Sequence, residues 1–333
     1  MSTIMIDCEG LTKRFGDHTA IDHLSLQVNQ GEIFGLVGPD GAGKTTTIRI
    51  LCGVMTPDDG NARVAGIDVR LEPDALKHRI SYMSQRFGLY GDLTVMENLR
   101  FYADLYEVPR REREVRVPRL LDFANLEPFR HRLADQLSGG MKQKLGLACA
   151  LIHTPTVLFL DEPTNGVDPV SRRDFWQLLY TFLKEGVTIF LSTAYLDEAE
   201  RCNRIALLHE GGLLAYDTPA GVKALLRDAV LELRCDQSRA ARVLLKPVPI
   251  FNDVVIAGDR LHLVVSANAG AEQGQAVVRE RLGGAGIVIH RLEAVAPSLE
   301  DLFIELVRRN RSNAADSASR GAGGAAHGSV DDG

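Results

Sequence analysis

The chain has 333 residues, of which 45% are hydrophobic and 25% are charged, a composition typical of a globular protein with one large domain and a smaller one. Its formal net charge of -6 argues against non-specific binding to nucleic acid, so no nucleic-acid partner is expected. No uninterrupted apolar run reaches about 18 residues and no secretory signal is recognisable, so any membrane-spanning part is expected from other chains.

The N-terminal part of the chain has the pattern of short strands. Ile4 to Cys8 and Ser25 to Val28 are predicted strands, and Phe15 to His18 is a predicted turn between them. Phe15 lies on a loop ahead of a glycine-rich stretch, so it is a candidate to stack on a nucleotide base. A partly buried aromatic side chain is the alternative that spacing alone leaves open.

The glycine-rich stretch lies between the apolar run Ile33 to Val37 and a predicted helix from Lys44 to Cys52. This strand, loop and helix order is typical of a phosphate-binding loop, because glycines let backbone N–H groups point inward and the helix N-terminus adds partial positive charge. In such a loop the Lys44 ammonium reaches the β- and γ-phosphates and the Thr45 hydroxyl ligates Mg²⁺. The predicted nucleotide-binding residues here are Gly38, Pro39, Asp40, Gly41, Ala42, Gly43, Lys44, Thr45 and Thr46.

A helical region follows a short predicted strand at Ile80 to Met83. From Leu93 to Leu137 the apolar residues recur at helical spacing. Within this region, Pro109 to Arg119 carries five arginines among two glutamates. A solvated helix face is the favoured interpretation of this run, with contact to acidic lipid or a partner as the alternative.

Strands return after the helical region. Val157 to Leu160, Thr188 to Leu191 and Ile205 to Leu208 are nearly continuous apolar runs, as expected for strands buried on both faces. Predicted helices at Arg172 to Lys184 and Leu196 to Glu200 separate them. This alternation predicts an α/β fold with a mainly parallel sheet.

The first domain is predicted to span residues 1–218, and a small α+β domain is predicted at residues 222–310. The tail, residues 311–333, lacks large apolar side chains and is predicted to be disordered. The expected strands of the small domain are Val230 to Cys235, Leu261 to Val265 and Ile287 to His290. Its expected helices are Ser238 to Leu245, Glu272 to Leu282 and Leu299 to Arg308.

Two further stretches carry chemistry. The strand at Val157 ends in Asp161 and Glu162, where the first carboxylate can hold the Mg²⁺ hydration shell and the second can polarise an attacking water. A surface pair of acids is the alternative interpretation. Upstream, Leu137 to Lys144 places a serine and glycines at the start of a helix, which predicts a second anion-binding helix N-terminus.

With these motifs in order, residues 4–218 resemble the ATP-binding subunits of ABC transporters, which are P-loop NTPases with a helical subdomain, here at about residues 86–150. The resemblance makes Gly38 to Thr45 the Walker A motif and Leu158 to Glu162 the Walker B motif with its catalytic glutamate. It implies that Gln85 is the Q-loop glutamine and that Phe15 stacks on adenine. The implied catalytic residues are Glu162, Lys44 and Gln85, and the implied Mg²⁺ ligands are Thr45, Gln85 and Asp161. The implied signature motif is Leu137, Ser138, Gly139, Gly140, Met141, Lys142 and Gln143. The implied D-loop is Asn165, Gly166, Val167 and Asp168.

The resemblance also implies how the site is completed. Two such domains pack head to tail, with ATP and Mg²⁺ between the Walker A motif of one and the signature motif of the other, as a homodimer or as a heterodimer with a second ATP-binding subunit. Ser138 and Gly140 would donate to the γ-phosphate of ATP held by the partner. A membrane permease would dock against residues 86–106, where Phe87, Tyr90 or Phe101 are candidates for the contact. A role in the core of the helical subdomain is the alternative for these aromatics.

Thr193 to Arg201 and Pro297 to Phe303 resemble the ABC-2-type exporters, the group that includes daunorubicin-resistance-like ATPases. An ATP hydrolase that powers an exporter is therefore expected, peripheral on the inner, cytoplasmic face of the cell membrane. The five scattered cysteines agree with a reducing compartment. A soluble ABC-type ATPase acting on ribosomes or DNA is the alternative, but the sequence lacks a second ATP-binding domain, a long coiled-coil insertion and zinc-binding cysteines.

One position departs from the family pattern. The pattern would place a histidine that contacts the γ-phosphate at position 194, where this chain has Ala194. His209 is the nearest histidine but lies beyond the next strand. Loss of a preorganised donor of this kind typically lowers the rate about 10² to 10³-fold. Either Glu162 carries hydrolysis adequately without it, or this chain is the slow or non-hydrolysing ATP-binding subunit of an asymmetric heterodimer.

Overall fold

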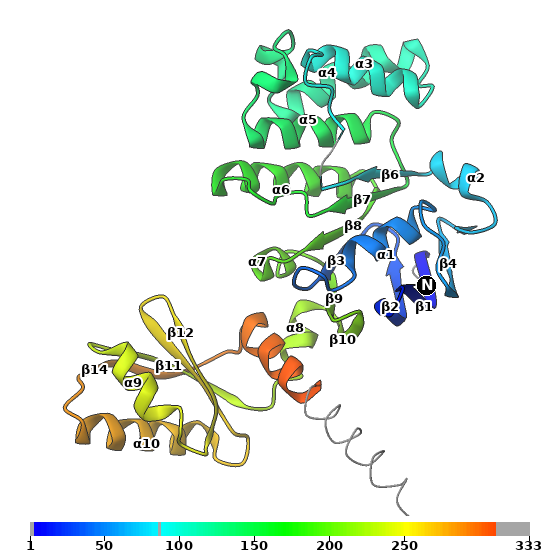
Figure 1. Ribbon diagram of the computed structural model, residues 1–333. Coiled ribbons are helices and arrows are strands. Elements are labelled where there is room, and N and C mark those ends of the chain that lie inside the picture. The colour runs from blue at the N-terminus through cyan, green and yellow to red at the C-terminus, as the bar shows by residue number, and fades with distance from the viewer. Residues whose placement is uncertain (1–2, 86–87, 311–333) are drawn as a thin grey trace, which may run out of the picture. The chain divides into compact units, whose positions relative to one another are not determined.

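The computed structural model describes residues 3–85 and 88–310 (Figure 1). The chain divides into two compact units, Met1–Pro219 and Ala220–Gly333. The predicted disordered tail and Phe87 lie outside the described residues. Within the part of the chain that is described, no helix is both long and apolar enough to cross a bilayer.

A six-stranded sheet in the order β10-β9-β3-β8-β7-β6 forms the centre of the first unit. All of its neighbouring pairs are parallel except β10 with β9. The strands are β3 (Ile33–Val37), β6 (Ile80–Met83), β7 (Val157–Asp161), β8 (Thr188–Thr193), β9 (Arg204–His209) and β10 (Gly212–Asp217). This arrangement confirms the predicted α/β class, and β3, β7 and β8 are buried along their whole length.

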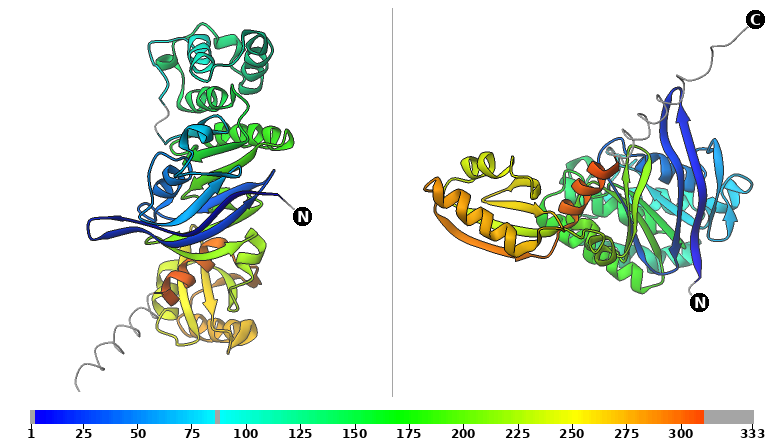
Figure 2. Two further views of the ribbon diagram at one scale, coloured as in Figure 1. Left: turned by 90° about the vertical axis from the view of Figure 1, so that its right-hand side faces the viewer. Right: turned by 90° about the horizontal axis from the view of Figure 1, so that it is seen from below.

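A second, antiparallel sheet has the order β2-β1-β4-β5. Its strands are β1 (Ile4–Phe15), β2 (His18–Asn29), β4 (Asp59–Val64) and β5 (Ile67–Asp68). The hairpin β1-β2, the long blue pair in Figure 2, is longer than the predicted strands at Ile4 to Cys8 and Ser25 to Val28. The sequence pattern missed this length because register shifts between Cys8 and Leu11 break the two-residue alternation.

Helices cover the central sheet and form the helical region. Those associated with the strands are α1 (Lys44–Leu51), α2 (Pro73–Lys77), α6 (Pro169–Lys184) and α7 (Leu196–Ala199), and α8 (Pro219–Lys223) begins where the second unit starts. The helical region contains α3 (Val95–Leu105), α4 (Arg110–Ala124), the 3-10 turns η1 (Glu127–Phe129) and η2 (Ala134–Gln136), and α5 (Gly139–Leu151). A capping box at Thr94 and Glu97 begins α3. The buried Asn98 side chain donates to three backbone carbonyls and so connects the first turn of α3 to the preceding loop.

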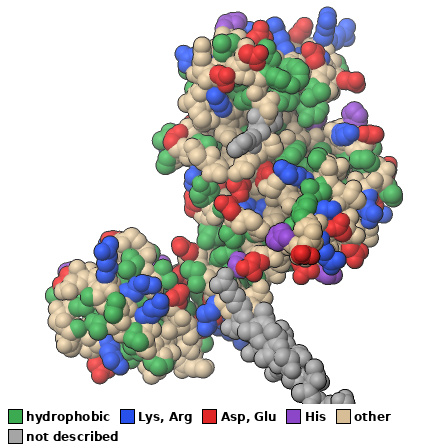
Figure 3. Space-filling model, in the orientation of Figure 1, with side chains coloured by type: hydrophobic (Ala, Val, Ile, Leu, Met, Phe, Trp, Pro, Cys, Tyr) green, Lys and Arg blue, Asp and Glu red, His purple; other side chains and the backbone are tan. Residues whose placement is uncertain are grey.

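The arginine-rich run lies on α4, and several of its side chains form ion pairs. Arg113 pairs with Asp104, and Arg119 pairs with Glu185 at the C-terminal end of α6. Over the visible face of the molecule, acidic and basic side chains are interspersed (Figure 3). The favoured interpretation of the run as a charged helix face agrees with these contacts.

The second unit is a four-stranded antiparallel sheet in the order β12-β13-β11-β14, with α9 and α10 sharing its apolar core. Its elements are β11 (Ala229–Cys235), α9 (Ser238–Leu245), β12 (Phe251–Ala257), β13 (Arg260–Val265), α10 (Gly270–Gly284), β14 (Ile289–Val295) and a last helical stretch at 299–310. The βαββαβ order is the ferredoxin-like split βαβ arrangement. The sequence pattern missed β12 because Asn252 and Asp253 interrupt its apolar run.

The last predicted strand of this unit was misplaced. The expectation was Ile287 to His290, whereas β14 begins at Ile289. Gly286 adopts a φ of 70° and the Ile287 amide donates to the Leu282 carbonyl, so these residues belong to the turn that ends α10.

The core of the first unit generates a stability prediction. Phe159 is fully buried in β7 and its ring centroid lies 5.6 Å from that of Phe190. Phe159→Ala is expected to lower the free energy of unfolding by about 3 to 5 kcal/mol, because it removes buried apolar surface and leaves a cavity. Trp176, the only tryptophan in the sequence, is buried in this unit, so urea unfolding followed by its fluorescence reports on this unit.

The matched control for that measurement is Phe15→Ala. The Phe15 side chain is 49% exposed, so without nucleotide the expected loss is less than about 1 kcal/mol. Equal losses in the two variants would contradict the assigned core.

Candidate nucleotide-binding site

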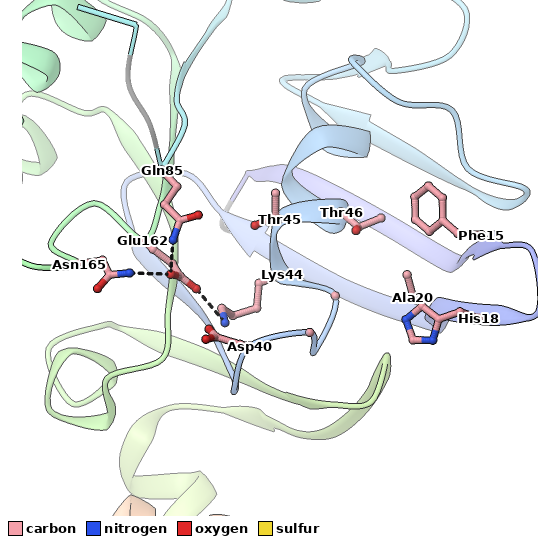
Figure 4. A pocket seen from close by; sticks show the side chains of 12 residues that line it. Phe15, His18, Ala20, Asp40, Lys44, Thr45, Thr46, Gln85, Glu162 and Asn165 are labelled. Atoms are coloured by element: carbon pink, nitrogen blue, oxygen red, sulfur yellow. Dashed lines mark hydrogen bonds and ion pairs between the residues drawn. The ribbon is translucent and has the colours of Figure 1, made fainter.

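A cleft of about 510 Å³ opens over the glycine-rich loop (Figure 4). It is lined by Phe15, His18, Ala20, Asp40, Gly41, Gly43, Lys44, Thr45, Thr46, Gln85, Glu162 and Asn165. Most of the predicted loop residues face this cleft. Gly38 and Pro39 contribute through their carbonyl groups instead, and Ala42 is buried.

The loop backbone requires glycine at Gly43, which precedes α1. Its φ is 98°, and a Cβ there would collide with the Ala20 carbonyl oxygen. In the described chain no side chain caps the N-terminus of α1. The first backbone N–H groups of this helix, together with its dipole, therefore suit a phosphate group.

Lys44 is the buried cation of the site, with a side chain only 4% exposed. Its Nζ donates to the carbonyl oxygens of Gly38 at 2.8 Å and Pro39 at 3.0 Å, and it lies 3.0 Å from Oε1 of Glu162. The ammonium group is thus held at the mouth of the loop, where it can contact an anionic substrate.

Three side chains converge on the Glu162 carboxylate (Figure 4). Besides Lys44, Gln85 donates through Nε2 to Oε2 at 3.1 Å, and Asn165 donates through Nδ2 to Oε2 at 3.4 Å. Glu162 has a φ of 48°, and its backbone N–H lies 3.0 Å from the Ser192 hydroxyl oxygen. Non-glycine residues rarely adopt this conformation, and such strain is concentrated at functional sites.

Oxygen atoms of the kind that ligate hard metal ions lie beside the loop at the end of β7. The Thr45 hydroxyl donates to Oδ1 of Asp161 at 3.1 Å, and Asp161 is 1% exposed. Ser192 also donates to Oδ1 at 2.7 Å, and the Tyr82 hydroxyl donates to Oδ2 at 3.3 Å. Burial and the negative charge of Asp161 raise the pKa of Tyr82 to about 12, so its hydroxyl remains a donor. A hydroxyl and a carboxylate in this position fit Mg²⁺, which prefers oxygen ligands.

Gln85 lies beside Glu162 at the cleft. Its Nε2 faces Glu162, and its amide oxygen lies on the side facing Thr45 (Figure 4). The Gln85 side chain thus contacts the Glu162 carboxylate, and its role as a Mg²⁺ ligand stays a prediction.

The hairpin β1-β2 forms the opposite wall of the cleft. Phe15 is half exposed at the end of β1, with His18 and Ala20 nearby on β2 (Figure 4). The sequence reasoning missed His18 and Ala20. Their two-residue spacing places both on one face of a strand and was the available signal.

The signature residues lie outside the cleft. Ser138 caps α5 by accepting from the Met141 N–H at 3.3 Å, and a Cβ on Gly140 would collide with Ser171. Lys142 and Gln143 line a different cavity of about 270 Å³, which they share with Gln85. Among the described residues, the cleft of a single chain therefore receives none of residues 137–143.

The segment after Glu162 contains the predicted D-loop. Asn165 is exposed and contacts Glu162, Gly166 has a φ of 73°, and Val167 is buried. Asp168 caps α6 by accepting from the backbone N–H groups of Val170 and Ser171. The hydrogen bond from Ser171 is the main reason that the pKa of Asp168 is lowered.

Ala194 faces a smaller cavity of about 130 Å³ beside Glu162, which Asp40, Thr164, Asn165, Thr193 and Tyr195 also line. An alanine side chain supplies no hydrogen-bond donor to this cavity. His209 ends β9, and its Nε2 is within 3.9 Å of Glu210.

Comparisons with known proteins identify the family. A model of the ABC transporter family matches residues 21–165. The chain is 42% identical over 311 residues to the probable multidrug ABC transporter ATP-binding protein YbhF of Escherichia coli (strain K12), covering 92% of this chain and 53% of that protein. The chain thus spans about half the length of this curated relative. It is 33% identical over 318 residues to the daunorubicin resistance ATP-binding protein DrrA2 of Streptomyces coeruleorubidus, covering 94% of this chain and 98% of that protein. It is 37% identical over 311 residues to the Nod factor export ATP-binding protein I of Rhizobium sp. (strain N33), covering 93% and 99%.

Solved structures agree with these relatives. An ATP-binding subunit of an ABC transporter superposes with a TM-score of 0.61 at 30% identity, covering 66% of this chain and 92% of that one. A dimeric ATP-binding cassette in a post-hydrolysis state with ADP and Pi superposes with a TM-score of 0.59 at 27% identity, covering 64% and 98%. Because relatives above 30% identity are matched over nearly their whole length, the chain belongs to the family of ABC transporter ATP-binding proteins.

Proposed function

We propose that this chain binds and hydrolyses ATP to power a membrane exporter, acting in a head-to-tail dimer. The observation that carries the proposal is the convergence of Lys44, Gln85 and Asn165 on the Glu162 carboxylate at the mouth of the loop cleft. A carboxylate at this place can accept a proton from an attacking water, while Lys44 contacts the phosphates of the substrate.

The oxygen atoms of Thr45 and Asp161, with the amide oxygen of Gln85, are the groups proposed to hold Mg²⁺. When bound, this ion would neutralise charge on the phosphates during phosphoryl transfer. Ser192 and Tyr82 both donate to Asp161 and so orient its carboxylate. Phe15 offers an exposed ring at the cleft edge for stacking on adenine.

The second wall of the site is proposed to come from another subunit. The N-terminus of α5, with Ser138 and Gly140, is a suitable donor to a γ-phosphate but lies outside the chain's own cleft. A solved relative of similar fold is dimeric with ADP and Pi, which supports this arrangement. A homodimer or a heterodimer with a second ATP-binding subunit would both complete the site.

Export and membrane association are proposed from the relatives, whose names describe drug resistance and Nod factor export. The chain would work on the cytoplasmic face of the cell membrane, held there by a permease. Tyr90 and Phe101 are 45% and 36% exposed, with ring centroids 4.6 Å apart, and together form a small aromatic surface for that partner.

A slow subunit in an asymmetric dimer is the second candidate. Ala194 favours it, because no donor at this position holds the attacking water and Glu162 in line. The ATP site would then bind normally, and a second ATP-binding subunit would supply most of the turnover.

The first prediction here concerns Glu162→Gln. The substitution keeps the size of the side chain but removes the base, so kcat is expected to fall at least about 100-fold while ATP binding is retained. The ATP-dependent dimer is expected to persist longer, as measured by light scattering after gel filtration. Glu114→Gln on the exposed face of α4 is the matched control, and its kcat should not change. Unchanged hydrolysis in Glu162→Gln would remove Glu162 from its role.

A mixing experiment tests the shared site. Ser138→Asp keeps a good helix cap but places a negative charge against the partner's phosphate, and Lys44→Met removes the cation, so each variant alone should be nearly inactive. Equal mixing gives half mixed dimers with one intact site each, so about a quarter of the wild-type ATPase should return. This recovery is expected of the homodimer, and for a wild-type chain that is active by itself, the absence of recovery would indicate a site formed within one chain.

Ala194→His separates the two candidate functions. If the chain is a slow subunit, the added donor should raise kcat, with about 10² to 10³-fold as the upper limit. Ala194→Leu fills the same cavity without a donor and should give no gain. Equal and brisk ATPase rates in the wild type and in Ala194→His would reject the slow-subunit candidate.

A further inference from the structure

Two hydrogen bonds in series connect Tyr195 to the Glu162 carboxylate. The Tyr195 hydroxyl donates to Oδ1 of Asn165 at 3.3 Å. The Asn165 amide then donates through Nδ2 to Oε2 of Glu162 at 3.4 Å. The residue next to Ala194 therefore reaches the proposed catalytic carboxylate through one intermediate side chain.

The two hydrogen bonds in series allow only one orientation of the Asn165 amide. A carboxylate accepts hydrogen bonds, so the Asn165 amide must turn its NH₂ group toward Glu162. Its carbonyl oxygen then faces Tyr195, whose hydroxyl supplies the proton. Removing that hydroxyl leaves the Asn165 amide held from one side only.

The ring of Tyr195 is itself fixed. The Arg172 guanidinium lies 4.5 Å from the ring centroid, in cation–π geometry. The Tyr195 N–H donates to the Thr193 hydroxyl at 3.0 Å, just before α7 begins. Arg172 also lies 3.6 Å from Asp197 and 3.7 Å from Glu198, which limits its movement.

The buried Glu198 carboxylate joins the two segments that contain Asn165 and Tyr195. Glu198 is 1% exposed and accepts from Thr193 at 2.8 Å, from the Trp176 indole at 3.5 Å and from Thr164. Thr164 immediately precedes Asn165, and Thr193 lies two residues before Tyr195. The spacing between the segment after β7 and the segment after β8 is therefore set by buried polar contacts.

Lys44 and Gln85 also contact Glu162, but each has another role in the proposed function. Lys44 is assigned to the phosphates and Gln85 to the metal, which leaves Asn165 as the contact free to orient the carboxylate. On the remaining side, Ala194 presents only a methyl group to the cavity of about 130 Å³.

We propose that Tyr195 is a positioning residue that orients Glu162 through Asn165 for attack of water on ATP. This inference rests on the proposed ATP hydrolysis and deepens it. In this proposal Tyr195 acts through Asn165 and not by contact with ATP. It acts by holding the Asn165 amide, and through it the carboxylate, in one orientation.

The test is Tyr195→Phe in the full chain, which keeps the ring over Arg172 and removes only the hydroxyl. We expect kcat for ATP to fall about three- to tenfold, the range for one hydrogen bond, while KM, nucleotide affinity and melting temperature stay unchanged. In the Asn165→Ala background the same substitution should cost less than about 1.5-fold, because its effect travels through Asn165.

Tyr180→Phe removes a tyrosine hydroxyl near the C-terminal end of α6 and is the matched control. Equal kcat in Tyr195→Phe and Tyr180→Phe would overturn the inference, as would a full and additive effect in the Asn165→Ala background. These results would leave the proposed function intact if the wild-type chain hydrolyses ATP and Glu162→Gln lowers kcat at least about 100-fold. A wild-type chain without such ATPase would instead contradict the proposed function and the inference with it.

Discussion

Parallel pairing of β3, β8 and β7 is the constraint on which the site depends. Val37 lies opposite Thr193 and Asp161 lies opposite Ser192, so these strands end at one edge of the sheet. The phosphate loop leaves from the first strand, and Asp161 with Glu162 leaves from the last. Because β8 lies between β3 and β7, the two strands are about 10 Å apart, and the long Lys44 side chain reaches Glu162 across that distance. The chemistry of the cleft is thus a consequence of strand order.

The ion pair between Lys44 and Glu162 is the buried charge contact of the site. The Lys44 ammonium and the Glu162 carboxylate neutralise each other at 3.0 Å, and removing one partner leaves a costly unpaired charge. In the proposed reaction Lys44 moves its charge to the phosphates, which frees Glu162 for a water molecule. The orientation of the Glu162 carboxylate then depends on uncharged hydrogen-bonding side chains. In the proposed reaction these are Asn165, which donates to Glu162, and Tyr195, which donates to Asn165.

The sequence predicted the parts of the fold that are local. Ile33 to Val37 was predicted with the observed bounds, because a strand buried on both faces has a nearly continuous apolar run, and the short strand Ile80 to Met83 also matches its prediction. The hairpin β1-β2 was predicted too short, since register shifts interrupt its alternation. The strand β12 was missed, since polar residues interrupt its apolar run. In the site, the motif residues were named from the sequence, and their roles stay predictions. The contacts of Tyr82 and Ser192 with Asp161, and of Tyr195 with Asn165, join residues on separate strands and loops, so no local pattern indicates them.

The central claim is that one chain supplies half of an ATP site and that Lys44 exchanges partners on binding. A structure of the full wild-type chain with Mg²⁺ and a non-hydrolysable ATP analogue, which prevents turnover and keeps the Glu162 carboxylate, tests it most directly. We predict that the Lys44 ammonium contacts phosphate oxygens and that Ser138 of a second subunit faces the γ-phosphate. ATP bound in a cleft that one chain completes by itself, with Lys44 still against residue 162, would contradict the account.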